Sequence, residues 1–372
     1  MLPPQPHETL DDIERRAVEW AEALDKAEKV GSRHHTVPRF YLERFADKDS
    51  RLWVRDRESD LQPGTGSLRR IDDMGIKDFY TSVIEGGVLD SRLEQVLAWI
   101  EGEAAAVLRT VLSPFEAARR LSVDEDLALS RFLAFQQVRG PRWRRELELM
   151  GDYYVKTTAT GRYPEVALAD MRFVPHPNEH LKTIGEAAQT LQPWISGRPN
   201  MLVIIDQPLI FTCDEPVILM CGDTVEHLPD CGVTEEQFLR RRKKRKGRNG
   251  TDRRTVHMYP TRPRGIAFAE EIVHPLAPNK VLILGPRGMD SDPVLRLAGE
   301  DALEFASDVN DEVLANAYQW VGAHPDHDEF RQTPLTPPGP LVNVCDGGSF
   351  MSKALQAAPT PRSPARLRKN WR

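Results

Sequence analysis

Two adjacent histidines, His34 and His35, stand where the chain has its clearest chemical character. An imidazole titrates near neutral pH, so it can transfer a proton or bind a metal ion. Because Pro38 fixes its own φ and keeps Val37 out of the helical region, we expect His34 to Val37 to be extended and a short helix to begin at or just after Pro38. Both histidines would then lie at a junction between elements, where side chains can face a cleft. The alternative is that one of them only bonds a main-chain carbonyl and fixes the turn.

Two predicted helices place four more polar residues. Glu94 and Glu101 lie seven residues apart, hence almost on one line along the first helix. Gln136 and Arg139 lie one turn apart near the end of the second helix. If the helices pack antiparallel, these side chains face one cleft. The alternative is that Glu94 caps its helix and Arg139 pairs with a carboxylate for stability.

Asp214 lies in the segment Thr212-Cys213-Asp214-Glu215-Pro216, directly after a predicted strand. Ends of strands are positions where a rigid scaffold presents reactive side chains. An Asx-type turn that closes a hairpin is the alternative role. Together these polar residues predict an acid–base site, or a site for a divalent metal, assembled across the fold. The candidate residues are His34, His35, Glu94, Glu101, Gln136, Arg139 and Asp214.

A block of basic residues spans Arg240 to Arg248 and contains neither an acidic residue nor an aromatic one. Such a run is typical of a solvated insertion. It is also where the phosphate backbone of a nucleic acid would bind, with salt-sensitive affinity. The candidate nucleic-acid contacts are Arg241, Arg242, Lys243, Lys244 and Arg245.

Hydrophobic periodicity predicts the elements that position these residues. The expected helices span residues 9–30, 91–111, 122–139, 142–155, 178–194, 234–249 and 301–321. Short runs rich in β-branched residues predict strands at residues 51–55, 74–83, 201–205, 209–212, 217–220, 255–259, 265–268 and 281–284. Most gaps between the later strands are too short for a helix, so antiparallel connections are favoured. The sequence therefore predicts an α+β fold, with a helical N-terminal half packed on a mostly antiparallel C-terminal sheet.

The composition is that of a globular protein, with 40% apolar and 28% charged residues in a chain of 372. The net charge of −6 gives no overall reason to expect nucleic acid. No signal-like or membrane-length apolar run is present, so we expect a soluble cytoplasmic protein without membrane contact. We expect a helical arm over residues 1–32, a single α+β domain over 33–330, and a disordered basic tail rich in Pro and Ala over 331–372.

Several short motifs, taken in order, resemble the bacterial family known as domain of unknown function 4238. They are His34-His35-Thr36-Val37-Pro38-Arg39-Phe40-Tyr41-Leu42, Asp78-Phe79-Tyr80, Leu93-Glu94 with Ile100-Glu101, Gln136-x-x-Arg139-Gly140-Pro141, Phe211 to Val217, Tyr259 to Pro263, and Asn310 with Asn316-Ala317. The resemblance covers roughly residues 33 to 322, and it implies no established activity. Cys213 stands where a serine is usual in the family, and Glu215 where an asparagine is usual.

Three functions remain open at this level. The first is hydrolysis of phosphodiesters with a divalent metal, because His35 before a hydrophobic residue and a proline is similar to the first motif of His-Asn-His nucleases. That match is partial, since the further Asn and His of the nuclease motif do not follow within a few dozen residues. The second is non-catalytic, regulatory binding of a nucleotide or nucleic acid. In the third, purely structural case the polar residues satisfy one another inside the core.

Overall fold

A computed structural model of the chain describes residues 33–74, 76–78, 83–85, 88–90, 92–110, 120–159, 167, 173, 177–220, 257–260, 265–266, 269–290, 292–337 and 341–345. The predicted arm over residues 1–32 and the predicted helix over 234–249, with the basic block from Arg241 to Arg245, lie outside these residues. So does the predicted tail beyond residue 345.

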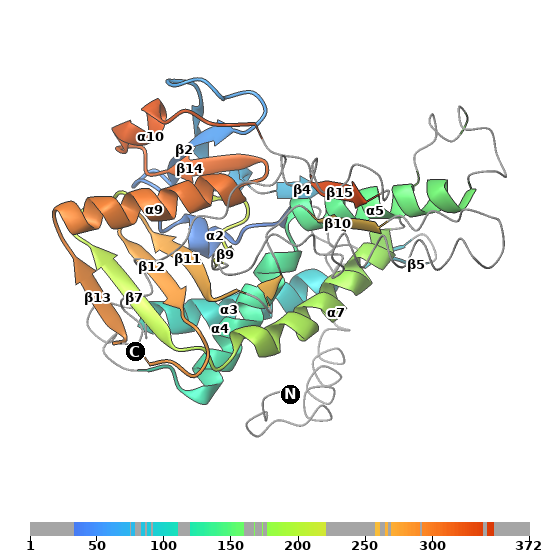
Figure 1. Cartoon of the computed structure of the whole chain (residues 1–372), viewed down its shortest axis with the longest axis horizontal. Helices are drawn as coiled ribbons and strands as arrows, with labels where there is room; N and C mark the ends of the chain where they lie inside the picture. The colour runs from blue at the N-terminus through green and yellow to red at the C-terminus, as the bar shows by residue number, and fades with distance from the viewer. Residues whose placement is uncertain are drawn as a thin grey trace, which may run out of the picture.

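A five-stranded sheet lies at the centre of the fold (Figure 1). Its strands, in spatial order, are β13 (Val294–Leu297), β7 (Asn200–Ile205), β12 (Lys280–Leu284), β11 (Glu271–Ala277) and β9 (Ile218–Met220). Neighbouring strands are antiparallel except β13 and β7, which are parallel. Every residue of β7 is buried, because helices cover both faces of the sheet.

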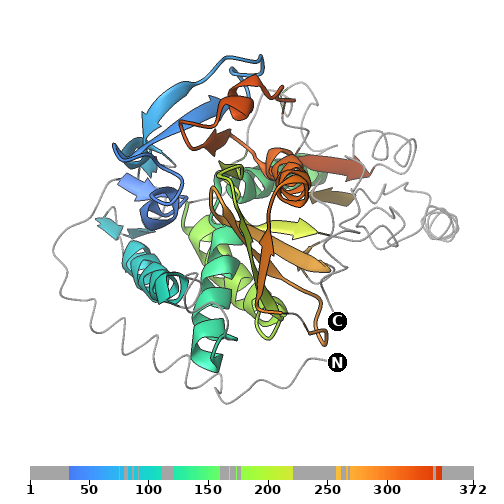
Figure 2. The ribbon, with the colours of Figure 1, turned by 90° about the vertical axis from the view of Figure 1, so that its left-hand side faces the viewer.

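Alternation along the strands divides the core into two layers. The face that carries Leu202 and Ile204 packs against three helices, and the face that carries Met201 and Val203 packs against one (Figure 2). The three helices are α3 (Arg92–Thr110), α4 (Val123–Val138) and α7 (Pro177–Ile195). The single helix on the opposite face is α9 (Glu300–Asn316). A further helix, α5 (Pro141–Ala159), follows α4 directly.

A second, four-stranded antiparallel sheet joins segments from both ends of the chain. Its order is β3 (Ser67–Arg70), β2 (Arg51–Asp56), β14 (Trp320–Ala323) and β8 (Thr212–Cys213). The short helix α2 (Arg39–Leu42) and the 3-10 helix η1 (Ile71–Asp73) pack on it in a third apolar cluster.

Three pairs of short strands and one short helix complete the described elements. The pairs are β1 (Arg33–His35) with β4 (Ile76–Asp78), β5 (Val83–Glu85) with β6 (Val88–Asp90), and β10 (His257–Pro260) with β15 (Val342–Cys345). The helix is α10 (Asp328–Gln332).

The α+β class is confirmed, and so are the local signals around the first candidate residues. β1 is extended, and Pro38, with φ −62° and ψ 140°, stands immediately before α2. Ser122 and Glu125 form the predicted capping box of α4, with reciprocal hydrogen bonds. Within the described residues, no helix combines the length and the apolar character needed to cross a membrane.

The end of the last long helix differs from the prediction. α9 stops at Asn316 instead of residue 321, and the following residues form β14. The Asn316 side chain donates hydrogen bonds to the carbonyls of Glu215 and Val217. The Asp214 carboxylate accepts from the main-chain N–H groups of Tyr318 and Gln319. These long-range hydrogen bonds favour an extended chain where periodicity alone suggests helix.

Residues 331–337 and 341–345, which lie in the segment predicted to be a disordered tail, contact other parts of the fold. Leu335 is buried, and its N–H donates to the carbonyl of Leu61 at 3.2 Å. The Arg55 side chain donates a hydrogen bond to the carbonyl of Thr333, and β15 pairs with β10. Partners far away in sequence therefore hold the described part of this segment.

Candidate functional site

The main-chain carbonyl of Thr36 is the point at which several candidate residues meet. Gln136 donates to it from Nε2 at 3.1 Å, and Arg139 donates from Nε at 3.0 Å. Arg139 also forms an ion pair through Nη1 with Oε1 of Glu101 on α3, at 2.5 Å. We call this group, with His35, the polar centre. It ties the turn after β1 to the end of α4 and to α3.

The polar centre is largely buried, but some of its polar atoms have no hydrogen-bond partner. The residues Thr36, Gln136 and Arg139 are at most 2% exposed, whereas the Glu101 side chain is 23% exposed. Three buried polar atoms have no protein hydrogen-bond partner: Nδ1 of His35, Oε1 of Gln136 and Nη2 of Arg139. Such atoms are uncommon in native proteins, and water or a ligand usually satisfies them.

A buried imidazole that the sequence did not single out, His274 on β11, contacts α2 and α4, the helices that flank the polar centre. Its ring stacks on Tyr41 with centroids 5.2 Å apart and meets Phe132 edge-on at 6.1 Å. Phe132 lies one turn before Gln136 on α4. Nδ1 donates to the carbonyl of Pro216 at 2.9 Å, so Nε2 carries the lone pair. Burial lowers the pKa of His274 to about 4, and the ring is neutral at pH 7.

The carboxylate of Asp214, by contrast, is hydrogen-bonded to main-chain N–H groups. Its two carboxylate oxygens accept from the N–H groups of Tyr318 at 2.8 Å and Gln319 at 2.7 Å. Burial raises the pKa of Asp214 to about 6, although these N–H donors favour the ionised form. The hydrogen bonds of Asp214 are long-range bonds to the segment before β14, and not the local Asx-type turn considered as the alternative. Its neighbour Glu215 packs closely against Gly140, the residue after Arg139.

Other predicted site residues are not described at side-chain level. His34 pairs with Lys77 through the backbone of β1 and β4, and Glu94 lies in the first turn of α3, but their side chains lie outside the described set. Among the described side chains, no group of three His, Cys, Asp or Glu residues is arranged to hold a metal ion. The described side chains alone therefore supply no such set of ligands, and the divalent metal suggested by the sequence stays a prediction.

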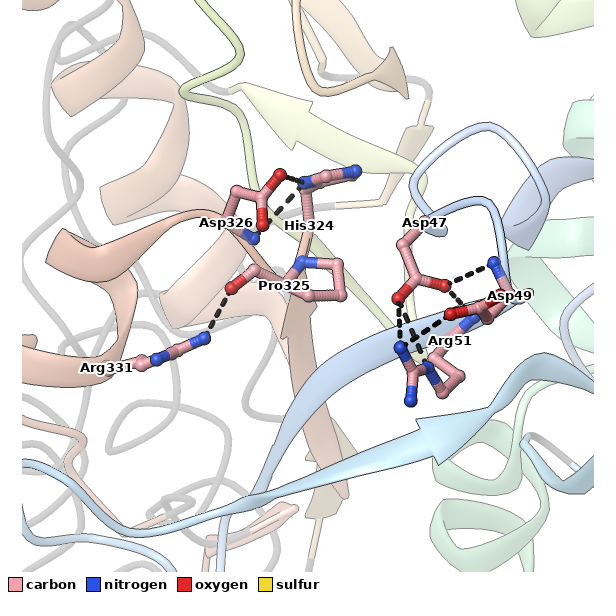
Figure 3. A network of polar contacts seen from close by, with 7 residues as sticks. All are labelled: Asp47, Asp49, Arg51, His324, Pro325, Asp326 and Arg331. Atoms are coloured by element: carbon pink, nitrogen blue, oxygen red, sulfur yellow. Dashed lines mark hydrogen bonds and ion pairs between the residues drawn. The ribbon is translucent and has the colours of Figure 1, made fainter.

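A second polar network lies at one end of the four-stranded sheet (Figure 3). Arg51 pairs with the carboxylates of Asp47 and Asp49, and His324 lies 3.7 Å from Asp326. Arg51, Asp49 and Asp326 are exposed, whereas Asp47 and His324 are partly buried, so this network is explained as polar contacts at the surface.

Comparison with known proteins gives one match. A family model described as protein of unknown function (DUF4238) matches residues 33–239, more than half of the chain. The chain belongs to the DUF4238 family. No curated protein and no solved structure matches it.

The segment matched to DUF4238 contains every residue of the polar centre, whereas His274 lies beyond it. The unusual Cys213 within the segment is fully buried, and burial raises the pKa of its thiol well above the ordinary value. A protonated, enclosed thiol is a poor nucleophile. Sequence analysis missed His274 because Pro275 follows it directly, and a proline argues against a central strand.

Proposed function

We propose that this DUF4238 protein binds a nucleotide or a nucleic acid, without catalysis, at the polar centre around Thr36. The observation that carries the proposal is the set of buried atoms without a protein partner, on His35, Gln136 and Arg139. A regulatory protein of this kind needs a ligand-binding site and no reactive group.

The chemistry of these atoms supports a nucleobase as the bound group. Arg139 Nη2 can only donate a hydrogen bond. Gln136 Oε1 can only accept one, because the amide nitrogen already faces the Thr36 carbonyl. A donor beside an acceptor complements the edge of a base, which presents both kinds of group. Since Glu101 already balances the charge of Arg139, a neutral base edge fits this centre better than a phosphate does.

The test compares two arginines, Arg131 on α4 and Arg139 at its C-cap, that each form an ion pair with a glutamate of α3. Arg139 pairs with Glu101, and Arg131 pairs with Glu103 at 3.0 Å. Binding of a panel of nucleotides and short single-stranded oligonucleotides is measured by calorimetry for Arg139→Lys and Arg131→Lys. We expect Arg139→Lys to weaken binding at least about tenfold, the loss of one charge-assisted hydrogen bond. Arg131→Lys should bind as the wild type does.

Gln136→Met provides a second variant in case Arg139→Lys does not fold. It removes the amide acceptor while keeping the volume of the side chain. Binding that is equal in the wild type and in both variants at the centre would refute the proposal. So would the absence of binding by any member of the panel.

Hydrolysis of a phosphodiester is the second candidate. It is favoured by His274, whose neutral ring has one nitrogen bonded and the other available as a proton acceptor. We propose no metal-dependent step for it, because the described residues do not fit a metal site. Turnover of a generic phosphodiester by the wild type, reduced at least about a hundredfold in His35→Ala or His274→Gln, would favour this candidate over binding alone.

A further inference from the structure

Four cations, of which Arg44 and Lys280 are half-buried and Arg109 and Arg296 are exposed, differ from the buried guanidinium groups of this fold. Within the described part of the chain, no hydrogen bond or ion pair joins the side chain of Arg44, Arg109, Lys280 or Arg296 to any acceptor. Elsewhere buried guanidinium groups are well matched. Arg198, for example, donates to the carbonyls of Trp194, Ala269, Glu270 and Gly285.

Strand register places two of these cations on the same face. Lys280 on β12 and Arg296 on β13 are both aligned with Ile204 on β7. Aligned residues on neighbouring strands point to the same side of a sheet, here the side covered by α3, α4 and α7. Two strand spacings separate Lys280 from Arg296, about 10 Å.

Arg44 and Arg109 extend the group from two other elements. Arg44 lies in the turn after α2, and Arg109 lies in the last turn of α3. Burial lowers the pKa of Arg44, and the charge of Arg109 lowers it further. Burial likewise lowers the pKa of Lys280, helped by the charges of Arg44 and Arg296. Arg44 therefore repels Arg109 and Lys280, and Lys280 repels Arg296.

Simple solvation does not explain this arrangement. Arg109 and Arg296 are exposed, but Arg44 and Lys280 are partly buried, and no carboxylate of the described residues forms an ion pair with either. The nearby carboxylate of Asp206 accepts a hydrogen bond from the N–H of Gly299. Repelling, partly dehydrated cations raise the free energy of the folded protein unless an anion binds between them.

We propose that Arg44, Arg109, Lys280 and Arg296 form a binding surface for the polyphosphate of a nucleotide. Arginine forks and a lysine ammonium are the groups that bind phosphate oxygens, and a polyphosphate carries several charges in a short chain. The identity of the rest of the ligand rests on the proposed function. α2 supports the link, because Thr36 of the polar centre precedes this short helix and Arg44 follows it.

The test uses inorganic tripolyphosphate, which has no base and so needs only this surface. Binding is measured by calorimetry at low and moderate salt for the wild type, Lys280→Gln and Arg44→Gln. The control is Lys182→Gln, an exposed lysine on α7 with one carboxylate 4.0 Å away. We expect Lys280→Gln and Arg44→Gln to weaken binding at least about tenfold each, and Lys182→Gln to leave it unchanged. We also expect Lys280→Gln to melt at a higher temperature than the wild type without ligand, because repulsion is relieved.

Tripolyphosphate affinity that is the same in Lys280→Gln and the wild type, or undetectable at millimolar concentration, overturns the proposal. A single-stranded oligonucleotide that needs Lys280, with no tripolyphosphate binding, also overturns it in favour of a nucleic acid. Arg139→Lys separates the two proposals. If tripolyphosphate binding depends on Lys280 but Arg139→Lys changes the affinity for no nucleotide, the phosphate-binding surface is supported and the proposed function is refuted.

Discussion

Individual buried arginines in this protein are satisfied mainly by main-chain carbonyls. Arg55, which is fully buried, donates to the carbonyls of Asp60, Leu61, Gln62, Phe330 and Thr333. Arg198 makes the same type of contact elsewhere. Arg139, in contrast, combines a carbonyl with a partly buried ion pair and a terminal nitrogen that has no hydrogen-bond partner. A burial pattern in the sequence does not distinguish these roles, because their partners are backbone atoms of distant residues.

Because the pKa of His274 is lowered in the folded protein, this residue makes the free energy of unfolding fall as the pH falls. Its pKa is about 4 in the folded protein, below the value of about 6.5 for an exposed histidine. The unfolded chain therefore binds a proton first as the pH falls. The contribution of neutral His274 to stability is complete above about pH 6.5 and is lost as the pH falls toward 4, by on the order of 3 kcal/mol.

The measurement is chemical unfolding of the wild type and His274→Gln between pH 7 and pH 4. His180, also lowered to about 4, and Asp214, raised to about 6, titrate in both proteins. The difference in unfolding free energy between the two proteins therefore isolates His274. We expect the advantage of the wild type to shrink by about 2–3 kcal/mol over this range. A difference that stays constant with pH would show that His274 is not held neutral.

At the scale of elements, helices with their own capping signals were predicted well, and strands stabilised by distant partners were not. α4 has a complete capping box, and α7 begins and ends within one residue of its predicted bounds. β11 was missed because it contains Pro275, where the structure has a register shift between Pro275 and Ala277. The described residues Gly265 and Ile266, predicted to begin a strand, are not in one.

The joint between α4 and α5 depends on a glycine. A Cβ added to Gly140 would overlap the carboxylate of Glu215, which is buried and has little room to move. We expect Gly140→Ala to lower the free energy of unfolding by about 1–3 kcal/mol, as overpacking does. Gly102→Ala on α3 is the matched control. Nothing lies within 4 Å of its new methyl group, and alanine favours the helix by about 0.5–1 kcal/mol. Equal effects of the two substitutions on urea unfolding would contradict the role given to Glu215.

The fold brings together some of the residues that the sequence analysis predicted for one site. Glu101, Gln136 and Arg139 meet at Thr36, which precedes Gln136 by 100 residues and Arg139 by 103. Helical spacing made this predictable, since each helix presents its residues on one line. Asp214 has its own partners just before β14, a strand that periodicity assigned to a helix. The placement of Asp214 therefore depended on a pairing that no local pattern encodes.

Segments distant in sequence hold the four-stranded sheet together, and Thr333 contributes to it through Arg55 of β2. Ending the chain after residue 330 removes the Thr333 carbonyl from Arg55, buried Leu335, and β15 from β10. A buried leucine and a buried arginine donor left without its acceptor are together worth at least about 3 kcal/mol. We therefore expect the chain ended at 330 to unfold at lower denaturant than one ended at 345, which keeps all three. Circular dichroism during urea titration measures the two midpoints.

Because the pairing of β14 with β2 depends on the loop that Arg55 fixes, the loss of stability should extend to the whole four-stranded sheet and not remain at the end of the chain. Coincident midpoints for the two chains would mean that residues 331–345 lie on the fold without stabilising it.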